Sequence, residues 1–135
     1  MVLSALRQRQ RNLHLIAWLR AIPESELFLS VITLGEVERG IAAVTPRDPV
    51  FAQRLVVWLD DVLRGFASRI LPVDVATARR WGRLGAAHGH GGADLLIAAT
   101  ALEHGLTVAT SNTRHFQGIG VMLVDPLAPQ NHDPP

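Results

Sequence analysis

The sequence contains no cysteine, which excludes a disulfide framework and any metal site built from thiolates. A bound metal ion would therefore need carboxylate or imidazole ligands, a donor set that favours Mg²⁺ or Mn²⁺ over structural zinc. No apolar run approaches the roughly 18 to 20 residues that a membrane-spanning helix needs, and no basic and then apolar signal peptide opens the chain. We therefore expect a soluble, cytoplasmic protein without a membrane partner.

Lysine is also absent, so all 13 basic residues are arginine, whose guanidinium group makes bidentate contacts with phosphate and carboxylate. The formal net charge is only +1, which is too small to predict a sequence-independent coat for nucleic acid. A GC-rich genome would produce the same bias toward arginine. The composition therefore permits an RNA partner without requiring one.

The length of 135 residues fits one domain with a single core. We expect this domain to cover residues 1–125, because the remaining residues 126–135 are rich in proline and read as a disordered tail.

Within that domain, helical periodicity alternates with short apolar runs that are typical of buried strands. The predicted helices cover residues 12–21, 33–43, 49–66, 74–87 and 94–104, after a helical stub at residues 2–6. The predicted strands cover residues 27–32, 69–73, 106–110 and 121–124. This alternation predicts an α/β fold, namely a three-layer α/β/α sandwich around a mostly parallel sheet.

This topology brings polar residues to the edge of the sheet where the parallel strands have their carboxyl ends. A helix that follows a parallel strand begins at that edge, and a helix that precedes one begins there too. Glu36 is expected in the first turn after the strand at 27–32, and Asp94 in the first turn before the strand at 106–110. Residues 110–116 leave the same edge. Two carboxylates that converge there would suit a hard cation such as Mg²⁺, with water completing the octahedron.

Each carboxylate also has a purely structural explanation. The stretch from Thr33 to Glu36 matches a capping box, in which the glutamate bonds back to the backbone N–H of the cap. Asp94 could be an ordinary N-cap that the helix dipole favours. The residue pattern alone leaves both explanations open.

Three stretches of the sequence resemble the PIN-domain family, and in particular its VapC/FitB-type toxins. Residues 30–41 (SVITLGEVERGI) look like the strand and helix that carry the catalytic glutamate of those toxins. Residues 93–110 are similar to the family's most recognisable stretch, in which an aspartate opens a helix that ends in glycine before a strand. Residues 112–126 complete the pattern with NTRHF, a glycine and a strand that ends at Asp-Pro. Together these stretches extend the resemblance over the chain up to the tail.

The resemblance implies that Glu36 and Asp94 are the catalytic, metal-binding acids of an endoribonuclease whose cofactor is Mg²⁺ or Mn²⁺. In the implied mechanism, the metal ion activates a water for in-line attack on an RNA phosphodiester and stabilises the departing 3′ oxygen. His115 falls where many relatives carry a further aspartate, so it would contact phosphate or a metal-bound water, or be a rim histidine without a metal bond. The implied substrate-binding or rim residues are Thr110, Asn112, Arg114 and His115.

Other polar residues have less specific explanations. Glu38 lies two residues beyond Glu36 and is expected to be solvated. The two histidines of residues 88–90 lie in a glycine-rich loop and could bind zinc, although the sequence offers no third ligand. The arginines of residues 7–11 could guide RNA together with Arg114, or they could form a solvated loop.

The resemblance also implies partners: RNA as substrate, a cognate antitoxin, a second copy in a homodimer, and operator DNA only through the antitoxin. Trp18 and Trp58 are candidate anchors of an antitoxin groove on the first helices, or ordinary core residues, because each lies on the apolar stripe of its helix. The alternative is an inactive or truncated PIN domain that only dimerises and binds an antitoxin. A nucleotide-binding α/β domain is disfavoured, because no glycine-rich phosphate loop follows a strand.

The beginning of the chain departs from the family pattern. Relatives open with a central apolar strand that ends in Asp-Thr-Asn, whereas here Met1 stands where the asparagine would be. We therefore expect the first catalytic aspartate to be absent and the central strand to be missing or incomplete, which would leave backbone groups of its neighbours unpaired. This departure predicts an upstream start or a product with little nuclease activity, unless Asp125 or His115 completes the site.

Overall fold

A computed structural model describes residues 1–3, 17–18 and 20–127, and it contains a five-stranded sheet with parallel pairing throughout. The strand order is β3-β2-β1-β4-β5. The strands are β1 (Val2–Leu3), β2 (Phe28–Ser30), β3 (Ile70–Leu71), β4 (Val108–Ala109) and β5 (Leu123–Val124). The main helices are α2 (Val31–Val44), α3 (Pro49–Phe66), α4 (Val75–His88) and α5 (Ala93–Glu103). The short 3-10 helices are η2 (Glu24–Glu26), η3 (Ala67–Arg69) and η4 (Thr113–Phe116).

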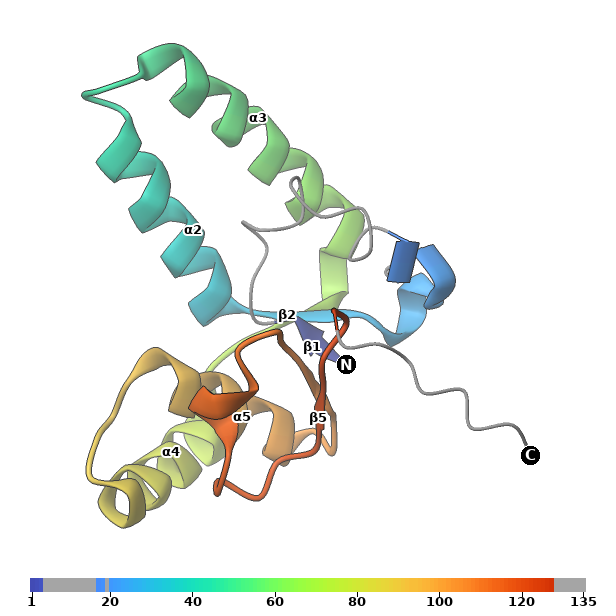
Figure 1. Cartoon of the computed structure of the whole chain (residues 1–135), viewed down its shortest axis with the longest axis vertical. Coiled ribbons are helices and arrows are strands. Elements are labelled where there is room, and N and C mark those ends of the chain that lie inside the picture. Colours follow the sequence, from blue (N-terminus) through green and yellow to red (C-terminus); the bar gives the residue numbers. More distant parts are fainter. Residues whose placement is uncertain (4–16, 19, 128–135) are drawn as a thin grey trace.

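Helices cover both faces of the sheet, with α2 and α3 on one side and α4 and α5 on the other (Figure 1). This arrangement confirms the predicted three-layer α/β/α sandwich with a parallel sheet. No helix within the described ranges combines the length and the apolar character that crossing a bilayer would require.

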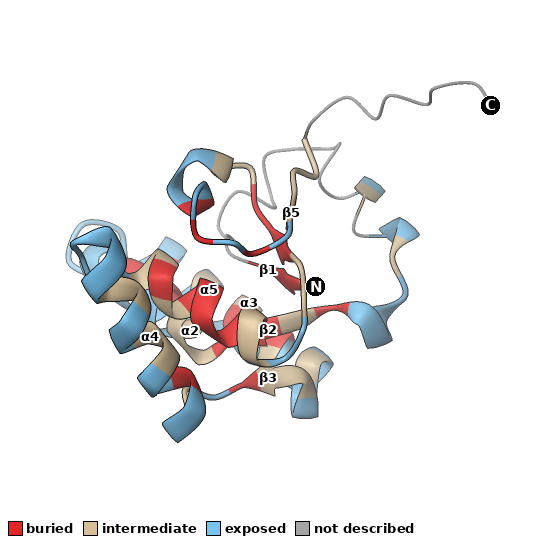
Figure 2. Ribbon diagram, turned by 90° about the horizontal axis from the view of Figure 1, so that it is seen from below, coloured by how far each residue is buried: buried red, intermediate tan, exposed pale blue. Residues whose placement is uncertain are grey.

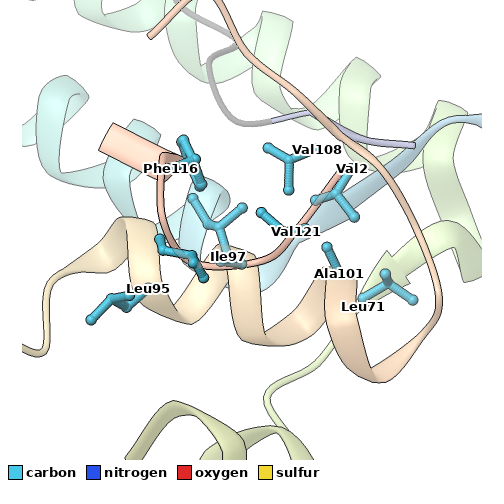
Figure 3. Close-up of a cluster of buried hydrophobic side chains, with 10 residues drawn as sticks. Val2, Leu71, Leu95, Ile97, Ala101, Val108, Phe116 and Val121 are labelled. Atoms are coloured by element: carbon cyan, nitrogen blue, oxygen red, sulfur yellow. The ribbon is translucent and has the colours of Figure 1, made fainter. Parts of the chain in front are cut away.

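The strands supply side chains to both layers, because successive residues of a strand point to opposite faces. Val2 and Val108 belong to the cluster that includes Ile97 of α5 (Figure 3). Their neighbours Leu3 and Ala109 belong to the second cluster, which packs beneath α2 and α3. Figure 2 shows that the buried residues gather on the strands and on α5, whereas much of α4 is exposed.

Strand β1 lies at the centre of the sheet, between β2 and β4. The N–H of Val2 donates to the carbonyl of Thr107 at 2.8 Å, and the carbonyl of Met1 accepts from the N–H of Phe28 at 2.8 Å. The central strand was predicted to be missing or incomplete, with unpaired backbone groups on its neighbours, but a two-residue strand is present and is paired on both sides. Residues 2–3 form this strand instead of opening a helical stub, because one apolar residue on each face and backbone pairing on both sides satisfy the centre of the sheet.

Helix α2 begins two residues earlier than predicted. Ser30 is its N-cap, and the serine hydroxyl accepts a hydrogen bond from the N–H of Ile32 at 3.1 Å. Thr33 is therefore the third helical residue, so the capping-box interpretation of Thr33 and Glu36 was wrong. Glu36 consequently lies in the second turn of α2 and not in the first.

Most other predicted boundaries agree with the structure to within a few residues. Helix α3 matches the predicted range 49–66, and Asp74 caps α4 as predicted by accepting from the N–H of Thr77 at 2.9 Å. The strands are only two or three residues long and are shorter than the predicted apolar runs. Short strands suffice here because pairing in this sheet occurs over a narrow band where all five strands overlap.

Two predictions fall largely on residues that the structure does not describe. Of the predicted helix at 12–21, residues 17–18 and 20–21 are described, and they are helical. Of the predicted tail at 126–135, residues 128–135 lie outside the described residues, as do the arginines of residues 7–11.

Helix α4 carries two glycines in its interior that differ in their surroundings. A Cβ atom added at Gly82 would meet nothing within 4 Å, whereas one added at Gly85 would lie 3.1 Å from the carbonyl oxygen of His90. The loop that follows α4 therefore packs against the helix at Gly85.

These glycines provide a matched test of that packing. We expect Gly82→Ala to raise the free energy of unfolding by about 0.5 to 1 kcal/mol, because glycine in a helix interior is less favourable than alanine by roughly that amount. Gly85→Ala should gain clearly less, because its methyl group must displace the carbonyl of His90. Urea unfolding of both variants beside the parent chain measures the difference. Equal stabilisation by the two substitutions would show that the loop does not pack on α4 as described.

Candidate functional site

The strand order changes direction beside β1, and in open parallel sheets such a switch point is where ligands bind, outside the carboxyl ends of the strands. Three segments meet at this edge, which we call the carboxyl rim: the first two turns of α2, the first turn of α5, and residues 110–116 after β4. Helix α5 contacts both α2 and η4. The hydroxyl of Thr33 donates to the carbonyl of Leu3 at 3.4 Å, which connects the start of α2 to the end of β1.

Asp94 lies in the first turn of α5 at the carboxyl rim. The N-cap of this helix is Gly92, so the interpretation of Asp94 as the cap was wrong. Its Oδ2 lies 3.0 Å from Nδ1 of His115, and the two side chains are 37% and 61% exposed, respectively. An ionised carboxylate can only accept a hydrogen bond, so the imidazole nitrogen is the donor. The contact joins α5 to η4.

A series of contacts holds the segment that carries His115. Thr110 is only 3% exposed, and its hydroxyl accepts from the N–H of Asn112 at 3.0 Å. The carbonyl of Asn112 in turn accepts from the N–H of His115 at 3.1 Å. Phe116 is 2% exposed and packs in the core cluster beside α5. Thr110 therefore has a structural role that the sequence did not indicate, while its predicted contact with water or phosphate stays a prediction.

Glu36 and Arg114 are exposed residues of α2 and η4. Helices α2 and α5 contact each other, so Glu36 and Asp94 belong to neighbouring helices that begin at one edge of the sheet. The approach of the two carboxyl groups to a shared ion stays a prediction. Glu38 is exposed, as expected for a solvated residue.

The oxygen donors at the carboxyl rim suit a hard cation that keeps several water ligands better than one that is enclosed by protein ligands. Among the described residues, no three His, Cys, Asp or Glu side chains are grouped so that they could hold a metal ion. Mg²⁺, however, usually keeps several waters and is bound through one or two carboxylates together with phosphates of the substrate. The oxygen donors of Glu36 and Asp94 fit that mode of binding.

Trp18 and Trp58 are half-buried and pack against the same core cluster, on the side of the sheet that α2 and α3 cover. Both indoles thus contribute to the core, as one of the two interpretations of these residues expected. Their role as anchors of an antitoxin groove stays a prediction.

Comparisons with known proteins agree with the fold. The model of the PIN domain matches residues 1–121. VapC ribonuclease Y4jK of Sinorhizobium fredii is 35% identical over an alignment that covers 95% of this chain and 94% of that protein. Toxin FitB of Neisseria gonorrhoeae is also 35% identical, with 93% of each chain covered. The chain belongs to the PIN-domain family.

A solved structure supports the same assignment. The structure of FitAB bound to an IR36 DNA fragment matches with a TM-score of 0.79 and 30% identity, covering 98% of this chain and 99% of the matched chain. The PIN-like fold is therefore confirmed over nearly the full length.

The contact between Thr110 and Asn112 leads to a test of how the rim is held. Thr110→Val keeps the shape of the side chain but removes the acceptor for the N–H of Asn112, whereas Thr110→Ser keeps the hydroxyl. We expect the valine variant to lose about 0.5 to 1.5 kcal/mol of unfolding free energy, the usual net contribution of one hydrogen bond, and the serine variant to lose less. Chemical denaturation measures both. If valine is tolerated as well as serine, this hydrogen bond does not hold the turn.

Proposed function

We propose that the chain is the ribonuclease toxin of a toxin–antitoxin pair, and that Glu36 and Asp94 hold a divalent cation, Mg²⁺ or Mn²⁺, at the carboxyl rim. The observation that carries this proposal is the 35% identity, over 95% of the chain, with a protein named VapC ribonuclease. Equal identity with a protein named toxin FitB supports the assignment to toxins.

The chemistry available at the rim supports hydrolysis of an RNA phosphodiester. A divalent cation held by the two carboxylates would neutralise charge on the phosphate and acidify a water molecule. The exposed guanidinium of Arg114 can bind a phosphate through two N–H groups. Asn112 is exposed as well, and its amide can donate to a phosphate or ribose oxygen. Asn112 and Arg114 would thus orient the substrate, and the cation held by Glu36 of α2 and Asp94 of α5 would polarise its phosphate.

A protein partner is part of the same proposal. Matches to this chain include FitAB on a DNA fragment and DNA-bound VapBC from Salmonella typhimurium. We propose a similar assembly for the present chain, which would bind a cognate antitoxin, form a homodimer, and contact operator DNA only through the antitoxin.

One observation favours a second candidate, an inactive PIN domain that dimerises and binds an antitoxin without cutting RNA. No acidic residue precedes Glu24 in the sequence, so neither β1 nor the residues that directly follow it supply a carboxylate. The two candidates differ in one measurable property, because only the first requires cleavage of RNA that depends on a divalent cation.

Cleavage of RNA by the purified chain tests the proposal. We expect cleavage in the presence of Mg²⁺ or Mn²⁺, its loss on addition of EDTA, and a fall of at least about 100-fold in Glu36→Gln and Asp94→Asn, because each amide keeps the shape but not the charge that a hard cation requires. Glu38→Gln is the matched control, since this exposed carboxylate lies on the same helix.

Three results decide between the candidates. Loss of cleavage in the two rim variants, with activity kept in Glu38→Gln, supports the ribonuclease. Full activity of Asp94→Asn would show that the metal ion is held elsewhere. Absence of cleavage in the parent chain, combined with tight binding of a cognate antitoxin, would favour the inactive PIN domain.

A further inference from the structure

The hydrogen bond between Asp94 and His115 differs from the other side-chain ion pairs in the described part of the chain. Arg80 and Glu103 join α4 to α5, and Arg64 and Asp61 form an exposed pair within α3, so neither of these pairs lies at the carboxyl rim. The pair of Asp94 and His115 instead joins the first turn of α5 to η4 at the carboxyl rim, where both side chains remain partly exposed. Its position suggests a role in the site.

Buried neighbours hold the backbone next to each of the two residues of this pair. Leu95 and Ile97, which follow Asp94 in α5, are 0% exposed. On the opposite side, His115 is adjacent to the buried Phe116 and donates its own N–H to the carbonyl of Asn112. Neither partner needs a large rearrangement to keep the bond, so the imidazole can hold the Asp94 carboxylate in one orientation.

We propose that His115 is a positioning residue for Asp94: its Nδ1–H fixes the carboxylate through Oδ2, so that the rest of the carboxylate is presented to a divalent cation. This inference rests on the proposed metal-binding role of Asp94. An ionised carboxylate offers about four acceptor sites, so a single hydrogen bond leaves capacity for a cation. Groups that orient a metal ligand in this way usually contribute roughly 10- to 100-fold to metal affinity.

Two other roles of His115 make different predictions. If its Nε2 were itself a ligand of the metal ion, affinity would depend on that nitrogen and not on Nδ1. If His115 instead competed with the metal ion for Oδ2, its removal would raise the affinity. The three roles can be separated because asparagine places an amide N–H near the position of Nδ1, whereas glutamine places an amide, whose oxygen can bind a metal ion, near the position of Nε2.

The test is titration of the full-length chain with Mn²⁺ alone, with the free ion followed by electron paramagnetic resonance. We expect His115→Ala and His115→Gln to weaken binding by roughly 10- to 100-fold, and His115→Asn to restore most of the loss. His104→Ala is the matched control, because His104 is an exposed histidine at the opposite end of α5 and should leave affinity unchanged. Thermal unfolding of each variant shows whether any loss of affinity reflects loss of fold.

The outcomes separate the inference from the function on which it rests. Suppose that the parent chain binds Mn²⁺ and that Asp94→Asn abolishes binding. If His115→Ala then binds Mn²⁺ as well as the parent or better, the metal site is supported but His115 does not position Asp94. Rescue by glutamine but not by asparagine would likewise overturn the inference, in favour of a direct ligand. If neither the parent chain nor any variant binds Mn²⁺, the proposed metal site and this inference both fail.

Discussion

Backbone hydrogen bonding on both sides of β1 joins the two halves of the sheet. This strand has only two residues, yet it pairs with β2 through Phe28 and Leu29 and with β4 on its other side. It also contributes Val2 to one core cluster and Leu3 to the other. Because α2 leaves the end of β2 and η4 follows the end of β4, the pairing of β1 sets the separation of the segments that form the carboxyl rim.

The sequence predicted the layers well and the short elements poorly. Helix α3 was predicted to the residue, because its apolar positions repeat over five turns and Asp48 and Pro49 mark its start. Strand β1 was misread because a stretch of so few apolar residues has no measurable period, and only pairing with distant strands decides its conformation. The start of α2 was misread because Ser30 and Thr33 are both good caps, and the β-branched residues between them favour a strand locally.

The candidate site was likewise predicted well in some respects and poorly in others. The order of strands and helices was enough to place the starts of α2 and α5, which carry Glu36 and Asp94, at one edge, because that conclusion needs only the direction of each element. The hydrogen bond from His115 to Asp94 was not predicted, since it joins residues 21 positions apart and depends on how η4 packs. The buried hydroxyl of Thr110 was also missed, although a threonine two residues before an asparagine in a turn is a signal that could have indicated it.

Hydrogen exchange at single amides is the most direct test of a sheet that is centred on β1. The N–H of Val2 donates to Thr107 and that of Phe28 to Met1, while the N–H of Val108 donates to Met122 in the neighbouring pairing. If residues 2–3 form the central strand, all three amides should exchange slowly and open together, as amides of one cooperative sheet do. Rapid exchange at Val2 and Phe28, with slow exchange at Val108, would show that the centre of the sheet is not formed by these residues and would contradict the placement of the carboxyl rim.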